Sequence, residues 1–473
     1  MELGAQTARE RYEIARLACD EEFLSRVFIN GRSFRHWTDQ PVRRELLTQI
    51  YDLSKWCPTS YNIAPLRVTY ITSPQAKAKL LRCVPNISKV DIQDAPVIAI
   101  LSADLNFFNH GESVGLDAAG VAWFRRSRDV ASREVLYNAK LMFGFFMIAS
   151  RMLGLDIAPL WPHVWNQSQI DEAFSDGNPN WSHWRPFLVC TLGYADKSRG
   201  ALAPRSPRLP FNRAAVVYDC RPPPLHSSLS TIAEDRWPME MTPKPLEPRV
   251  VAAIREQKQL YQEKVIFRCA RSYSSYYPKF YEPDFGSADL ERIYDIAKLY
   301  PSAFNCTPLR YIFILSPGHG TQDPSESHPH LTEGIAIMTD QEETKRAGSS
   351  KLFEPARRAY DLVMESLTSD NRETSLSAPL LVVLAVDYGF MGKFGITNPK
   401  GDYESYIAES KAELFSEMAL TNALYGVGWF ISVIRAMGYD CGPMGGYDEA
   451  ILNRLFLPAD AESTETEWRD ERT

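Results

Sequence analysis

The sequence has no pair of cysteines in a CxxC arrangement, which removes the simplest signature of a zinc site or a redox dithiol. The eight cysteines are spread along the 473 residues, at Cys19, Cys57, Cys83, Cys190, Cys220, Cys269, Cys306 and Cys441. Such a pattern is typical of reduced thiols in a cytoplasmic protein and argues against a disulfide framework. We therefore expect a cytoplasmic protein that holds no metal.

Two other features of the composition exclude whole classes of partner. The formal net charge is −7 and charged residues make up 23% of the chain, so nothing indicates a nucleic-acid surface. The most apolar stretch, Leu141–Leu155, contains Arg151 and is shorter than the ~20 residues of a bilayer span, which favours a buried helix. The first thirty residues mix acidic, basic and apolar side chains, so we expect no signal peptide and no membrane partner.

What the sequence does contain is an internal repeat. Residues 55–67 (KWCPTSYNIAPLR) and 298–310 (KLYPSAFNCTPLR) are identical at six of thirteen positions, at an offset of 243. Residues 138–159 and 422–443 are identical at eight of twenty-two positions, at an offset of 284. The order is preserved and the offset grows by 41 residues, as expected for one domain present twice with an insertion in the second copy. Two unrelated domains with similar helices are the weaker interpretation.

The length and the prolines place the boundaries of the two copies. A chain of 473 residues suits about two domains. Prolines concentrate in residues 221–248, and because proline lacks a backbone donor and disfavours helix at the residue before it, we expect an extended linker there. The predicted domains are residues 1–220 and residues 249–473. The second is expected to lack the last strand of the first, because a polar tail follows Leu457.

Each copy is predicted to contain the same elements in the same order. Apolar periodicity and flanking Pro and Gly residues predict, in the first copy, helices at 42–56 and 132–153 and strands at 67–71, 96–103 and 187–194. In the second copy they predict helices at 249–268 and 416–437 and strands at 310–315 and 380–386. The helix that ends at Gly154 is apolar almost all round, so it needs protein on every side. A helix from the other copy would supply it.

Three segments of the first copy are candidates for binding an anion and a flat ring. The stretch Arg32-Ser33-Phe34-Arg35 combines two guanidinium groups with a hydroxyl, and Arg205 and Arg208 form a second basic pair. Arginine binds phosphate oxygens in a bidentate manner. The loop at residues 58–62 (PTSYN) offers hydroxyls, an amide and backbone N–H groups to the edge of a heterocycle. Taken singly, each has an ordinary alternative, because exposed arginine pairs are usually solvated and Pro-Ser turns are common.

Together these segments resemble the FMN-dependent nitroreductase family. The likeness rests on RSxR at residues 32–35, PTSYN at 58–62 and GPMGG at 442–446, and it covers about residues 26–215 and 265–456. The stretch that begins GRSFRHWTDQPV is most similar to the branch with the malonic semialdehyde reductases. The resemblance implies an α+β sandwich that forms intimate dimers. We therefore expect two fused nitroreductase-like α/β sandwich domains that form a pseudo-dimer within one chain, with higher association possible.

The resemblance also implies which residues bind FMN, because in this family the site lies at the dimer interface and takes a loop from the partner. A first site would combine residues of both copies, namely Arg32, Ser33, Arg35, Arg205, Arg208, Pro301, Ser302 and Asn305. A second site would combine Arg271, Ser272, Gly442, Gly445, Gly446, Pro58, Thr59, Ser60 and Asn62. In the second copy the RSxR motif ends in Ser274 and the basic tail is missing, so we expect this site to be degenerate. Trp161 and His163 either line the substrate space or cover the core.

The expected function is that of an FMN-dependent oxidoreductase. It would transfer hydride between the flavin N5 atom and a small organic substrate, with NAD(P)H or oxygen as the other partner and no catalytic side chain. A flavin-binding pseudoenzyme or regulatory protein without turnover is the alternative, suggested by the decay of the second site.

Overall fold

The computed structural model describes residues 8–84, 89, 92–160, 166–175, 180–199, 205–221, 246–272, 285–317, 350–398 and 412–456. Its strands are β1 (Leu66–Ile71), β2 (Val97–Asp104), β3 (Asp156–Leu160), β4 (Trp184–Gly193), β5 (Ala215–Asp219), β6 (Leu309–Leu315) and β7 (Leu380–Val386). Its longer helices are α1 (Ala8–Ala18), α3 (Arg44–Ser54), α4 (Pro74–Leu80), α6 (Ala118–Arg126), α7 (Arg128–Met152), α8 (Gln167–Phe174), α10 (Pro248–Glu256), α12 (Ser287–Ala297), α13 (Ser350–Ser366), α14 (Ser369–Leu376), α17 (Ala412–Ala436) and α18 (Glu449–Phe456). The short elements are α2 (Glu21–Leu24), η2 (Ser25–Ile29), η3 (Ser60–Asn62), η4 (Phe107–Val114), η6 (Trp181–His183), α9 (Phe211–Ala214), α11 (Lys258–Glu263), η9 (Lys264–Arg268), η10 (Ala303–Asn305), η12 (Phe390–Lys393) and α15 (Phe394–Thr397).

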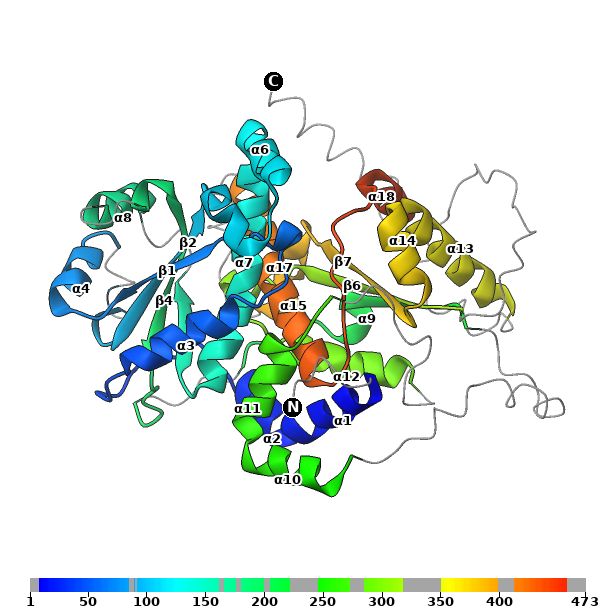
Figure 1. Ribbon diagram of the computed structural model, residues 1–473, viewed down its shortest axis with the longest axis horizontal. Coiled ribbons are helices and arrows are strands. Elements are labelled where there is room, and N and C mark those ends of the chain that lie inside the picture. Colours follow the sequence, from blue (N-terminus) through cyan, green and yellow to red (C-terminus); the bar gives the residue numbers. More distant parts are fainter. Residues whose placement is uncertain are drawn as a thin grey trace.

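The first sheet is antiparallel throughout and has the strand order β1-β2-β4-β3. Strand β2 is buried at every position, and its apolar run at residues 97–101 is typical of a strand covered on both faces. Its alternate residues face two cores: Val97, Ala99 and Leu101 face the one that contains α3 and α7, whereas Ile98 and Ile100 face the one near α4 and α8. The sheet is therefore covered on both faces (Figure 1).

The second sheet has the order β5-β6-β7. Strand β6 runs antiparallel to β7 and parallel to β5, so that Ala215 lies opposite Tyr311. One face of this sheet packs on α13 and α18, and the other faces the central core (Figure 1). Strand β5 thus comes from the segment predicted as the first domain but completes the sheet formed by the later part of the chain.

The two longest helices, α7 and α17, pack against each other in the centre of the molecule (Figure 1). Two glycines allow their backbones to touch, because a Cβ on Gly144 would lie 2.6 Å from the Trp429 amide nitrogen and one on Gly428 would lie 2.1 Å from the Leu141 carbonyl oxygen. Residues 414–436 of α17 are long and apolar enough to cross a membrane, yet 78% of the relevant window is buried inside the protein. This helix is a core helix.

Several sequence predictions of element boundaries need correction. The helix expected at 249–268 is interrupted after α10, because Gln257 adopts a non-helical conformation (φ −116°, ψ 39°) before α11 begins. Helix α7 starts at Arg128, four residues earlier than predicted, and it ends as expected before Gly154, whose φ is +85°. Strands β3 and β5 were not predicted, because each is only five residues long and one contains a proline.

Candidate functional site

Two loops in equivalent positions of the repeat have the same unusual backbone. Tyr61 and Asn62 have φ values of 55° and 56°, and Phe304 and Asn305 have values of 49° and 56°. A third residue in each loop, Ala64 or Thr307, is also in the left-handed region, with φ of 36° or 39°. Non-glycine residues rarely adopt this conformation, and clusters of them are typical of functional sites. Both loops were predicted as candidate ring-binding segments.

The same hydrogen bonds hold both loops. The amide of Ser60 donates to Asn138 Oδ1 and the amide of Ala303 donates to Asn422 Oδ1, each over 2.8 Å. Within each loop a hydroxyl accepts a hydrogen bond from the backbone amide five residues later. Thr59 Oγ1 accepts from the Ala64 amide (3.2 Å) and Ser302 Oγ accepts from the Thr307 amide (3.1 Å). The two asparagines occupy equivalent positions in α7 and α17. The long central helices therefore fix the conformation of both loops.

Arg32 and Arg205, two of the predicted phosphate ligands, converge on one short segment of backbone. Arg32 Nη1 donates to the carbonyls of Ile29 (3.4 Å) and Gly31 (3.1 Å). Arg205 donates to the same two carbonyls, at 3.0 Å for Gly31. Two guanidinium groups that are 173 residues apart in the sequence thus share their acceptors.

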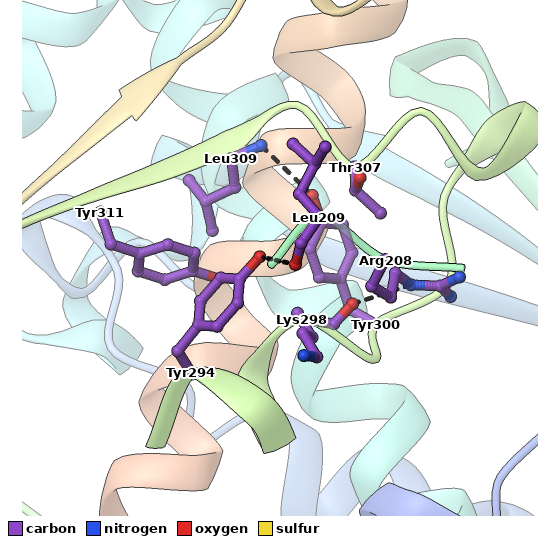
Figure 2. A pocket seen from close by; sticks show the side chains of 8 residues that line it. All are labelled: Arg208, Leu209, Tyr294, Lys298, Tyr300, Thr307, Leu309 and Tyr311. Atoms are coloured by element: carbon purple, nitrogen blue, oxygen red, sulfur yellow. Dashed lines mark hydrogen bonds between the residues drawn. The ribbon is translucent and has the colours of Figure 1, made fainter. Parts of the chain in front are cut away.

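Arg208 lies near the cation of Arg32 and bonds to the segment just before the loop of the later repeat. Its Nε donates to the carbonyl of Lys298 (2.9 Å), which directly follows α12 (Figure 2). Asn305 Nδ2 donates back to the carbonyl of Pro207 (2.7 Å) and also to that of Thr397 (2.5 Å). The structure therefore brings Arg32, Arg205 and Arg208 of the first half near Asn305 of the second half. Arg208 also lines a small cavity of about 10 Å³, roughly space for one water molecule.

The electrostatics of this group favour an anion. Among the described residues none of the three arginines forms an ion pair, and Arg32 Nε is buried there without a hydrogen-bond partner. Burial lowers the pKa of Arg208 to about 10, and the nearby cation of Arg32 acts in the same direction. Cations crowded without carboxylates are stabilised by a ligand that brings negative charge and several acceptor oxygens. We call Arg32, Arg205 and Arg208 the arginine cluster.

The predicted second site is only partly assembled. Arg271 Nη1 donates to the carbonyls of Arg268 (3.0 Å) and Ala270 (2.9 Å), which repeats the pattern of Arg32. Within the described ranges no second arginine donates to those two carbonyls. The loop residue Asn62 donates to the carbonyl of Val114 (2.8 Å), as Asn305 does to that of Thr397, but among the described residues it has no counterpart of the bond from Asn305 to Pro207.

The other predicted site residues take varied positions. In the first site Ser33 and Arg35 are exposed, whereas Pro301 and Ser302 are half-buried in their loop; in the second site Pro58 is half-buried and Ser272 is exposed. Gly442 and Gly445 form no hydrogen bond in the described part of the chain, and the Gly446 carbonyl accepts from Thr368 and Asn371 at the start of α14. Trp161 and His163 lie outside the described residues.

Sequence reasoning did not identify Asn138 and Asn422 as residues that support the site. Each is the first residue of its copy of the second repeated segment, so the identity of the two residues could have marked them as candidates. It also did not assign a role to Arg151, a buried cation on α7 that lies next to Gly31. The sequence marks Arg151 only as a charge within an apolar run.

Comparison with known proteins gives a consistent family assignment for part of the chain. The family model described as "Nitroreductase family" matches residues 30–194. A relative from Leptothrix cholodnii, named as an NADH dehydrogenase/NAD(P)H nitroreductase, is 37% identical over 202 residues, which are 42% of this chain and 98% of the relative. A relative of the same name from Stenotrophomonas maltophilia is 35% identical over 42% of this chain and 98% of its own length. A solved nitroreductase structure from Exiguobacterium sibiricum, in complex with FMN, has 20% identity and a TM-score of 0.33, covering 45% of this chain and 98% of that one.

Proposed function

This chain belongs to the nitroreductase family, and from that premise we propose that it is an FMN-dependent oxidoreductase whose flavin lies between the two halves of the chain. The arginine cluster is the observation that carries the proposal, because it gathers unpaired cations from residues 32 to 208 beside a strained loop of the later repeat. The names of the relatives support NAD(P)H as the electron donor. The other substrate is a small organic molecule.

The residues present fit FMN. Its phosphate carries about two negative charges and three acceptor oxygens, which match the three guanidinium groups and the unpartnered Nε of Arg32. When bound, the flavin supplies the hydride-transfer chemistry, and the protein supplies binding, orientation and electrostatics. Arg32, Arg205 and Arg208 hold the phosphate end. The loop that contains Ser302 and Asn305, fixed by Asn422, orients the ring end with its backbone and amide groups.

We further infer that the chain is a fused duplication that forms a pseudo-dimer, with domains at residues 1–220 and 249–473 and a linker at 221–248. The matched loops, the matched asparagines and the packing of α7 on α17 support this. The ion pairs Arg67–Asp104 and Arg310–Asp387 also occupy equivalent positions. In this interpretation the first domain contributes strand β5 to the sheet of the second domain, where it pairs with β6. The first domain is nearest to the malonic semialdehyde reductase-like branch, and the protein is cytoplasmic.

Activity is tested by mixing purified protein and FMN with NADH or NADPH and a panel of nitro, quinone, enone and aldehyde acceptors. Donor oxidation that depends on FMN and on an acceptor supports the proposal. A protein that binds FMN but oxidises no donor would instead favour a flavin-binding protein without turnover. Assembly is tested by light scattering, in which one chain of 53.7 kDa should form the compact unit. Pairing of the first halves of two chains would contradict the pseudo-dimer.

A further inference from the structure

Arg151, near the end of α7, lies directly against the backbone that carries Arg32. Its side chain is buried, and its Nη1 lies 3.4 Å from the carbonyl of Val27 in η2. Its guanidinium group is also 5.2 Å from the ring of Trp429 on α17. This one side chain therefore contacts the segment before the arginine cluster and the central helix of the other half.

The absence of a side chain at Gly31 makes this contact possible. A Cβ on Gly31 would lie 2.2 Å from Arg151 Nη1 and 2.3 Å from its Cζ, whereas ordinary van der Waals contact begins near 3.4 Å. Gly31 does not adopt a left-handed conformation, so its backbone has no need of glycine. The glycine leaves space for the guanidinium group. That group lies beside the residue whose carbonyl accepts from both Arg32 and Arg205.

The other half of the chain repeats the arrangement except at this position. Arg435 of α17 is buried, donates to the carbonyl of Ile266 in η9 (3.1 Å) and lies 5.5 Å from the ring of Phe145 on α7. The residue equivalent to Gly31 is Ala270, at the same offset of 239 that relates Ile266 to Val27. Ala270 carries a methyl group at the position where Gly31 has no side chain. A glycine at this position, with the guanidinium group against it, is thus shown for the half that contains the arginine cluster, whereas the other half has an alanine.

We propose that Arg151 is a positioning residue for flavin binding, which holds the Gly31 backbone so that Arg32 and Arg205 converge on the flavin phosphate. The inference rests on the proposed function. Because Arg151 also packs on Trp429, it links the phosphate end of the site to the helix that fixes the loop at residues 301–305. Placement of the phosphate ligands and placement of the ring-binding loop then depend on one another.

Matched variants in the two halves test this on the full-length protein. Arg151→Met and Arg435→Met each remove a buried arginine with a carbonyl contact and an aromatic contact. Both should lower the melting temperature of the flavin-free protein. Only Arg151→Met should raise the Kd for FMN, by about tenfold or more, because a misplaced Arg32 or Arg205 would lose one charge-assisted hydrogen bond to the phosphate. It should also shift the ³¹P resonance of the bound FMN phosphate.

A second pair avoids the loss of a buried charge. Gly31→Ala should weaken FMN binding in the same direction and move the ³¹P resonance, whereas Ala270→Gly should leave both unchanged. Equal FMN affinities for Arg151→Met and Arg435→Met, or a Gly31→Ala protein with native Kd and ³¹P shift, would overturn the positioning role while leaving the proposed function intact. A wild-type protein that binds no FMN would overturn the proposed function and this inference with it.

Discussion

The contact between α7 and α17 should not tolerate a methyl group at Gly428. A Cβ there would lie 2.1 Å from the Leu141 carbonyl oxygen and 3.2 Å from Gly144 Cα, against about 3.4 Å for ordinary contact. Both clashes are with backbone, so Gly428→Ala must move the helices apart by roughly 1 Å. Overpacking of this kind costs ~1–3 kcal/mol, of which the better helix propensity of alanine offsets up to about 1 kcal/mol.

Gly395, in α15, provides the matched control. It is exposed and a Cβ there would meet no atom within 4 Å, so Gly395→Ala should leave stability unchanged or raise it by up to about 1 kcal/mol. Urea unfolding followed by circular dichroism measures both variants. We expect a lower midpoint for Gly428→Ala than for Gly395→Ala. Equal midpoints, or a more stable Gly428→Ala protein, would show that the helices do not touch as described.

Two further predictions concern buried charges. Arg67 and Asp104 form an ion pair 2.9 Å apart, so Asp104→Ala leaves the largely buried Arg67 cation without its carboxylate and should destabilise the protein by ~3–5 kcal/mol. Asp52→Ala, which removes the exposed pair with Lys55, should change the urea midpoint little. Similar losses of stability for both variants would refute this prediction. Burial raises the pKa of Asp156 above its ordinary 3.8, because the folded protein favours the protonated carboxyl group. The stability that this protonated group contributes is therefore fully present below pH 3.8 and is lost as the pH rises through the raised pKa. Asp156→Asn keeps an acceptor for the Ala195 amide and should stabilise the protein at pH 7 in urea unfolding; no gain there would contradict the prediction.

Much of the central architecture could be predicted from the sequence because its signals are local. The strand expected at 380–386 is found with the same bounds, since its residues are uniformly apolar. Helix α7 and the strand at 96–103 were found within a few residues for the same reason. The offset of 243 between residues 55–67 and 298–310 also marked two loops whose backbones match.

The remainder depends on contacts between distant residues. Strand β5 reads as AVVYD, and only the pairing with β6, more than ninety residues later, makes it a strand. In the sequence Arg151 is only a charged residue within an apolar helix, and its contact with Gly31 is visible only in the folded chain. The convergence of Arg32 and Arg205 on the carbonyls of Ile29 and Gly31 is likewise a property of the folded chain. Residue types suggested these arginines, and only tertiary structure shows how they share acceptors.

Flavin stoichiometry tests the arginine cluster most directly. Equilibrium titration of flavin-free protein with FMN should give about one flavin per chain, because the cluster supplies three arginines and its counterpart supplies Arg271. Each charge-assisted hydrogen bond contributes ~1.5–3 kcal/mol, so Arg32→Ala with Arg205→Ala should weaken binding by roughly two to four powers of ten. Arg271→Ala should leave it nearly intact. Two tightly bound flavins per chain, or loss of the flavin on changing Arg271 alone, would contradict the assignment of the site to the arginine cluster.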